Sequence, residues 1–185
     1  MYQKEYIERI QLYRTYTYTH PQPTSKMGID ILCNGESYSC GYVAWALFRE
    51  EIANASIRYL NKIYDDMLNR TVESTTEQLA EQTLIEKILE YVNSMNCITT
   101  EDFVYFFKDI DFQNTFIYFE LGGVYALLNK GDGDGFYTVG NSLDIVDTME
   151  LVEPYIMYDD VKSRYNSVKK VFNESVMARR VVIIC

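Results

Sequence analysis

A long stretch with helical spacing of apolar residues, from about Cys40 to Leu68, constrains the fold of this chain more than any other feature. Apolar side chains that recur every three or four residues lie on one face of an α-helix, and that face is normally buried. The apolar positions of this stretch are Val43, Leu47, Ile52, Leu60, Ile63 and Met67. We therefore expect one long helix here, in a fold that contains more helix than strand.

Four further helices are predicted by similar patterns, and three of them start at a residue that can cap a helix. Thr, Ser, Asn and Asp cap helices well because their side chains accept hydrogen bonds from the first free backbone N–H groups. In chain order, the predicted helices are the acidic segment Thr71–Val92, a helix capped by Thr99 or Thr100, a short helix capped by Asn141 or Ser142 that ends near Pro154, and a last helix capped by Asp159 or Asp160.

Strands are predicted in three places. The sequence IDILCNG reads as a short strand that ends in the turn Asn34-Gly35, and VVIIC at 181–185 reads as a buried strand. The region near 115–140 is aromatic, β-branched and interrupted by glycines. We expect a small antiparallel β-meander there, with Gly122-Gly123 as a two-residue turn. The expected class is therefore α+β, helix-rich.

The chain length favours a single domain. With 185 residues, of which 48% are hydrophobic, the chain can bury one sizeable core. Residues 1–23 place Tyr2, Tyr6, Ile10 and Tyr13 at helical spacing and then become proline-rich. We therefore expect an N-terminal helix or arm with a linker at 1–23, and one globular α+β domain at 24–185.

The composition gives no signal for a membrane segment, a metal or a cofactor. No window approaches the roughly 18 uninterrupted apolar residues of a membrane span, and the charged start lacks a signal-peptide core. We expect a cytoplasmic protein without a membrane partner. The four cysteines are scattered and only one histidine exists, which disfavours a zinc site. A calcium loop at 130–141 is also disfavoured, because Lys130 and Asn141 would occupy ligand positions, so we expect a turn there.

Cys40 suggests one enzymatic alternative. It stands where the long helix is expected to start, and a helix N-terminus favours a thiolate. The surrounding sequence YSCGYVAW resembles the nucleophile region of papain-like and NlpC-like cysteine peptidases. That resemblance implies a cysteine-dependent hydrolase with Cys40 as nucleophile and His20 as its base.

The charge of the chain, −10 overall, is distributed unevenly. Residues 1–70 carry 8 basic and 8 acidic side chains, and residues 71–160 carry 3 basic and 18 acidic ones, a net charge of −15. Residues 161–185 carry 6 basic and 1 acidic side chain, a net charge of +5. Such asymmetry is informative about partners. Direct nucleic-acid binding is disfavoured, except weakly through the basic C-terminal helix, because phosphate contacts need clustered Lys and Arg.

Glu73, Glu77 and Glu81 recur every fourth residue, and no Lys or Arg lies between Arg70 and Lys87. On a helix they would form one row, and each adjacent pair would repel by roughly 0.2–0.5 kcal/mol. Such carboxylates would lie about 6 Å apart along the helix axis, a spacing comparable with that of phosphates along a nucleic-acid strand. The alternative is an ordinary solvated acidic surface.

These features predict a protein that binds the basic, nucleic-acid-binding groove of another protein and inhibits it by imitating phosphates. Its size, charge and composition are similar to those of small acidic anti-defence proteins of phages and mobile elements, such as anti-CRISPR and anti-restriction proteins. A regulatory or structural subunit, whose positive C-terminal segment docks on its own acidic surface or on a second copy, is a further alternative. The candidate contact residues are Glu73, Glu77, Glu81, Asp132, Asp134, Asp144, Asp147, Glu150, Asp159 and Asp160.

Overall fold

The computed structural model describes residues 28–70, 75–94, 98–109, 116–130 and 135–185. Helices predominate in this part of the chain and a small antiparallel sheet accompanies them, so the predicted α+β class is confirmed. The helices are α2 (Tyr42–Leu68), α3 (Thr76–Asn93), α4 (Thr100–Asp109), α5 (Phe116–Asn129), α6 (Val139–Val152), the short 3-10 helix η2 (Glu153–Tyr155) and α7 (Asp159–Ala178). The strands are β1 (Gly28–Cys33), β2 (Glu36–Gly41), β3 (Gly135–Tyr137) and β4 (Val182–Ile184). The predicted arm at 1–23 lies outside the described residues.

The sheet has four antiparallel strands in the order β2-β1-β4-β3. The hairpin of β1 and β2 turns at Asn34 and Gly35, whose φ angles are 44° and 92°. Both residues lie in the left-handed region, as a two-residue hairpin turn of type I′ requires. The sequence therefore predicted this turn and the C-terminal strand β4 correctly, although it gave no sign that β4 lies between β1 and β3.

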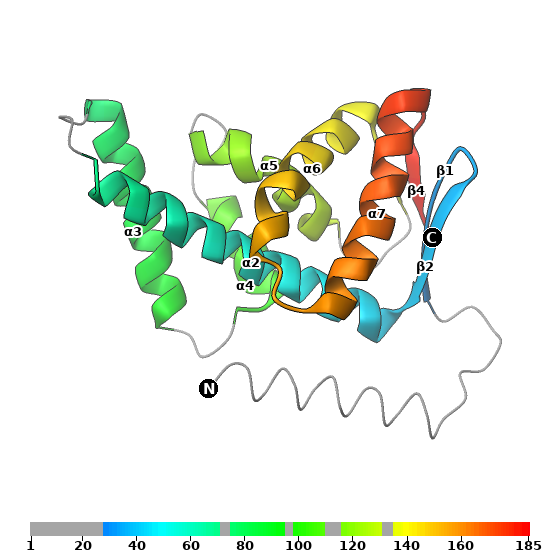
Figure 1. Ribbon diagram of the computed structural model, residues 1–185, viewed down its shortest axis with the longest axis horizontal. Helices are drawn as coiled ribbons and strands as arrows, with labels where there is room; N and C mark the ends of the chain where they lie inside the picture. Colours follow the sequence, from blue (N-terminus) through cyan, green and yellow to red (C-terminus); the bar gives the residue numbers. More distant parts are fainter. Residues whose placement is uncertain (1–27, 71–74, 95–97, 110–115, 131–134) are drawn as a thin grey trace, which may run out of the picture.

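The helices cover one face of the sheet and extend away from it. α7 lies against the sheet, while α2 starts beside β2 and crosses the molecule to the far end, where α3 and α4 pack on it (Figure 1). The core includes Trp45 and Phe48 of α2, whose stacked rings are 5.2 Å apart, and Phe172 of α7, which meets Tyr137 of β3 edge-on. None of the described helices combines the length and the hydropathy that crossing a membrane demands.

The predicted β-meander near 115–140 is wrong. Residues Phe116–Asn129 form the helix α5, and only Gly135–Tyr137 forms a strand, which pairs with β4. Gly123 lies inside α5 and is required for helix packing, not for a turn. A Cβ atom on Gly123 would lie 1.9 Å from the carbonyl oxygen of Asp144, so glycine is what allows α5 to approach the backbone of α6.

Two of the predicted helix caps are also wrong. Thr99 caps α4 as expected, because its Oγ1 accepts the backbone N–H of Asp102 at 3.1 Å. α6, however, is capped by Thr138, whose Oγ1 accepts the N–H of Asn141 while the Asn141 side chain binds back to Thr138. Asn141 is thus the third helical residue and Ser142 is buried further along the helix. Asp159 and Asp160 lie in the first turn of α7 and do not cap it, since the N-cap residue is Tyr158.

Candidate functional site

The outward face of α6 gathers three of the predicted contact residues. Asp144, Asp147 and Glu150 are all exposed, and they recur every third residue. Leu143 and Leu151 lie on the same side of the helix and are 46% and 37% exposed. We call these five residues the α6 outward face. The opposite side of the helix is buried against α5 and α7, and it includes Ile145, Met149 and Val152.

The carboxylates of this face are only partly neutralised by the rest of the described chain. Lys169 of α7 lies 3.1 Å from Glu150 and 3.5 Å from Glu153. Among the described residues, no ion pair joins a basic side chain to Asp144 or Asp147. Partial burial raises the pKa of Asp144 above its ordinary value, and the negative charge of Asp147 raises it further. Asp144 and Asp147 therefore lie close together, and no ion pair with a described residue neutralises either of them.

Two of the three glutamates of the predicted row, Glu77 and Glu81, lie in the described part of the chain, on α3. Glu73 lies outside the described residues, and α3 begins at Thr76 after a capping box of Thr75 and Gln78. Glu77 is exposed in the first turn of α3, where the partial positive charge of the helix N-terminus stabilises a carboxylate. Glu81 follows one turn later and is half-buried. The position of Glu77 is thus explained by its favourable interaction with the N-terminus of α3, without a partner protein.

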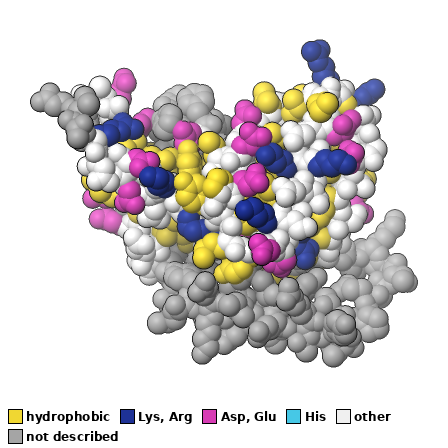
Figure 2. Space-filling model, viewed as in Figure 1, with side chains coloured by type: hydrophobic (Ala, Val, Ile, Leu, Met, Phe, Trp, Pro, Cys, Tyr) yellow, Lys and Arg dark blue, Asp and Glu magenta, His cyan; other side chains and the backbone are white. Residues whose placement is uncertain are grey.

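The remaining acidic residues are dispersed. Asp159 is exposed and Asp160 half-buried at the start of α7, whereas Asp132 and Asp134 lie outside the described residues. α3 lies at the other end of the molecule from α7 (Figure 1). On the face that Figure 2 shows, acidic side chains are interspersed with Lys, Arg and apolar side chains. Among the described residues, the structure therefore brings together the acids of α6 and places those of α3 at the other end of the molecule.

The basic C-terminal segment is partly engaged within the chain. Besides the contacts of Lys169, Lys170 lies 2.8 Å from Glu36 of β2. Lys162, Arg179 and Arg180 are exposed. Lys169 and Lys170 of this segment therefore contact acidic side chains of the same chain. The partners of Lys169, Glu150 and Glu153, belong to the acidic region 71–160, which agrees with the alternative in which the positive segment docks on the chain's own acidic surface.

Cys40 does not lie at the start of the helix. It belongs to β2, and α2 begins two residues later, at Tyr42. Burial raises the pKa of the Cys40 thiol, and the neighbouring Tyr38 hydroxyl and the charge of Arg164 offset this only in part. A raised pKa disfavours the thiolate that a nucleophile needs. His20 lies outside the described residues, so its pairing with Cys40 stays a prediction.

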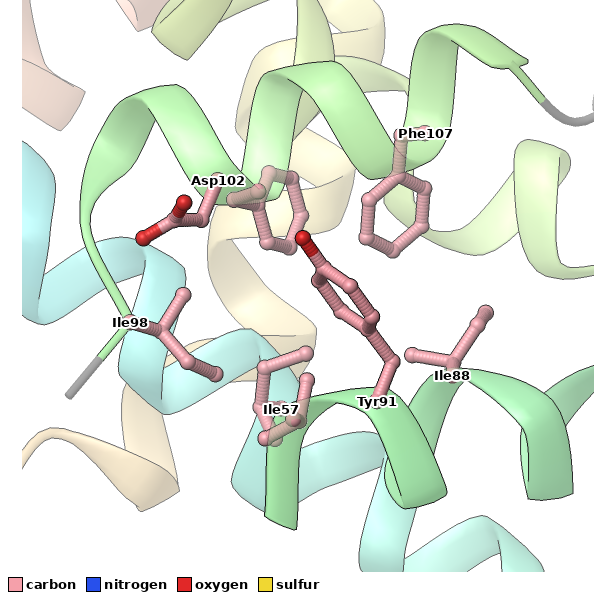
Figure 3. A pocket seen from close by; sticks show the side chains of 8 residues that line it. Ile57, Ile88, Tyr91, Ile98, Asp102 and Phe107 are labelled. Carbon is pink, nitrogen blue, oxygen red and sulfur yellow. The ribbon is translucent and has the colours of Figure 1, made fainter. Parts of the chain in front are cut away.

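A small apolar hollow lies where α2, α3 and α4 meet. Ile57, Ile88 and Ile98 surround it with Tyr91, whose hydroxyl points toward α4, and Asp102 lies at its edge (Figure 3). Its volume of about 10 Å³ is that of a single water position. Small-molecule sites are far larger, on the order of 300–1,000 Å³. Nor, in the ranges that the structure describes, do three His, Cys, Asp or Glu side chains gather to hold a metal ion.

Searches against protein-family models, curated proteins and solved structures give no match to this chain. The function therefore has to be inferred from its own residues. Reasoning from the sequence found the acids of α6 but missed Leu143 and Leu151. A helical projection of residues 143–151 would have found them, because it places both leucines between the carboxylates on one side.

Proposed function

We propose that the protein binds another protein through the α6 outward face and so keeps a basic, nucleic-acid-binding groove of that partner unoccupied by nucleic acid. The observation that carries this proposal is the combination of three exposed carboxylates with two exposed leucines on one helix face. Two leucines beside three carboxylates on one face suit a contact surface better than a face that is only solvated. Protein interfaces, by contrast, combine an apolar centre with a polar rim.

Electrostatics supports a basic partner. Partial burial first, and then the charge of Asp147, raise the pKa of Asp144, so its ionised form is disfavoured in the free protein. A cationic groove that contacts the two carboxylates removes the repulsion between them on binding. Complementary charge of this kind mainly increases the association rate and the specificity, and its effect weakens as salt screens it.

The test is a displacement experiment with purified proteins. The full chain is added to a restriction endonuclease and, separately, to a guide-loaded CRISPR nuclease, each holding a short fluorescent DNA duplex. The decrease in fluorescence anisotropy is then measured at low and at physiological salt. We expect displacement of DNA from at least one of them, weaker at the higher salt. D144N/D147N/E150Q should lose this displacement.

A matched control separates a specific face from total charge. D65N/E90Q/E101Q removes the same number of exposed carboxylates from α2, α3 and α4. This control should displace DNA nearly as well as the wild type. Equal losses in the two triple variants would mean that overall charge matters rather than the α6 outward face. Displacement that neither salt nor the α6 variant affects would contradict the proposal.

The hydrolase alternative receives less support. Its nucleophile would have to ionise although burial raises the pKa of Cys40. If Cys40 is nevertheless catalytic, it reacts with iodoacetamide faster than the buried Cys33 in the folded protein, and Cys40→Ala abolishes hydrolysis. Equally slow labelling of the two thiols would argue against this alternative.

A further inference from the structure

The sheet has a second face, which the described helices do not cover, and exposed apolar side chains from three strands lie on it. Leu32, Ile183 and Phe136 are 37%, 48% and 57% exposed. They come from β1, β4 and β3, and the strand register places Leu32 opposite Ile183 and Ile183 opposite Phe136. Cross-strand neighbours of this kind have Cβ atoms about 5 Å apart, so the three side chains form one continuous strip. We call it the outer sheet row.

The outer sheet row departs from what a solvent-facing sheet normally shows. An antiparallel sheet with one wet face alternates buried apolar residues with exposed polar ones. β2 follows this rule, because Ser37 and Ser39 occupy its exposed positions. β1 follows it at Asp30 but has Leu32 at its other exposed position, and β4 and β3 have Ile183 and Phe136 at theirs. Val181, 46% exposed, extends the apolar strip along β4. Contiguous exposed apolar side chains of this kind mark a surface that is covered by something else.

The part of the chain that precedes β1 has the right position to cover it. Residue 27 is joined to Gly28, the first residue of β1, so this segment of 27 residues ends on the sheet itself. An extended strand rises about 3.3 Å per residue, which places Leu32 about 13 Å from Gly28. A flexible linker of the length of residues 14–27 spans about 20 Å on average. The start of the chain can therefore reach the outer sheet row.

The same segment has the right chemistry and size. Its sequence places Tyr2, Tyr6, Ile10 and Tyr13 at helical spacing, with polar residues such as Lys4 on the other side. On a helix this apolar stripe would be about 16 Å long. Four strands at their usual separation of about 4.8 Å make a sheet about 14 Å wide. A stripe of this length crosses all four strands, and aromatic side chains bury a large area on such a surface.

We propose that residues 2–13 dock on the outer sheet row through Tyr2, Tyr6, Ile10 and Tyr13. The segment then acts as a tethered strap on the side of the sheet that α7 does not cover. Because it is tethered, its effective concentration at the sheet is on the order of millimolar, so a separate molecule has to compete with it for this surface. This inference does not depend on the function proposed for the α6 outward face.

The exposed thiol of Cys185 provides a native reporter for this docking. Cys185 follows β4, and its backbone exchanges hydrogen bonds of 3.1 and 2.8 Å with Asp30, so it lies beside the outer sheet row. In the full chain, N-ethylmaleimide should label Cys185 more slowly than it labels the free peptide VVIIC. Mass spectrometry can follow this one site, because trypsin releases residues 181–185 after Arg180.

The decisive comparison uses two variants of the segment. Tyr6→Ser/Ile10→Ser removes apolar side chains from the stripe and should raise the labelling rate of Cys185 by about tenfold. The reason is that burial of two such side chains changes the equilibrium constant of docking by at least about tenfold. Lys4→Ser/Gln11→Ser changes the polar side and should leave the rate unchanged. Phe136→Ser on the sheet should raise the rate as the stripe variant does, with an unchanged far-ultraviolet spectrum as the check of folding.

Two results would overturn the proposal. One is a labelling rate that is equal in the wild type, the stripe variant and the free peptide, which would mean that nothing covers this surface. The other is a slow rate that depends on protein concentration and persists in the stripe variant, which would mean that a second copy of the chain covers the row.

Discussion

Glu51 illustrates how one buried carboxylate connects two parts of the fold. It lies on α2 with only 2% of its surface exposed, it forms an ion pair with Arg58, and it accepts the backbone N–H of Met157 at 2.9 Å. Arg58 in turn donates to the carbonyl oxygen of Tyr155 at 2.8 Å. This cluster fastens the connection between α6 and α7 onto α2. Burial nevertheless raises the pKa of Glu51 above its ordinary value of 4.5, because desolvation outweighs the hydrogen bonds and the charge of Arg58.

The sign of this shift gives a prediction about pH. A carboxyl group whose pKa is higher in the folded state binds its proton more tightly there, so its contribution to stability is largest at low pH and declines as pH rises above 4.5, through the folded pKa. Glu51→Gln cannot ionise. The free energy of unfolding of the wild type should therefore fall relative to that of E51Q as pH rises through this window. Urea denaturation at several pH values measures the difference, and a constant difference would contradict the prediction.

Gly123 allows a second prediction at the scale of one residue. Gly123→Ala places a Cβ atom 1.9 Å from the carbonyl oxygen of Asp144, so α5 and α6 have to move apart. We expect a loss of about 1–3 kcal/mol of stability, as for other overpacked sites, measured by urea denaturation. Gly140→Ala is the matched control on α6, because its Cβ would meet only Thr138 Oγ1 at 3.8 Å. This control should be neutral or stabilising by up to about 1 kcal/mol.

At the scale of helices, the acids of α3 and α6 should respond to neutralisation with opposite signs. Glu77 interacts favourably with the N-terminus of α3, so Glu77→Gln should lower the free energy of unfolding by roughly 0.3–1 kcal/mol. Asp147 repels Asp144, so Asp147→Asn should raise it by roughly 0.2–0.5 kcal/mol. Both differences should shrink at high salt. Thermal unfolding of the two variants beside the wild type measures these differences. Changes of the same sign would contradict either the stabilising role of Glu77 or the repulsion between Asp144 and Asp147.

Helices with apolar residues on one face could be predicted from the sequence. Elements whose residues are dictated by packing against another element could not. α2 and the Asn34-Gly35 turn follow from local spacing and local backbone conformation, so the sequence predicted both. α5 looked like strands because it is aromatic and contains Gly122-Gly123. Its glycine at 123 is required by the approach of α6, which no local pattern reports.

The candidate site was predictable to a similar extent. The acids of α6 were found because their charge is visible in the sequence, whereas their separation from Glu77 of α3 depends on how the helices pack. Leu143 and Leu151 were missed because charge alone does not show which leucines share the face of the carboxylates, whereas a helical projection does.

At the scale of the whole molecule, the net charge of −10 predicts a dependence of stability on salt. Self-repulsion of a highly charged chain destabilises its compact state. Salt screens this repulsion, because the Debye length falls from about 30 Å at 0.01 M to about 8 Å at 0.15 M. We expect the melting temperature to rise over this range, measured by calorimetry in sodium chloride. D144N/D147N should show a smaller rise, and a melting temperature that falls with salt would mean that attractive ion pairs such as Lys170–Glu36 dominate.

The strand order has a consequence for the kinetics of folding. β1 pairs with β4 across roughly 150 positions of the chain, and the helices α2 to α7 lie between the two strands in sequence. Closing so long a loop is entropically unfavourable until other contacts have brought its ends together, and folds with many non-local pairings are slow to form. The helices, whose hydrogen bonds are local, can form before that closure. In a stopped-flow refolding experiment, helical circular dichroism should therefore recover ahead of the protection of the β4 amides from hydrogen exchange.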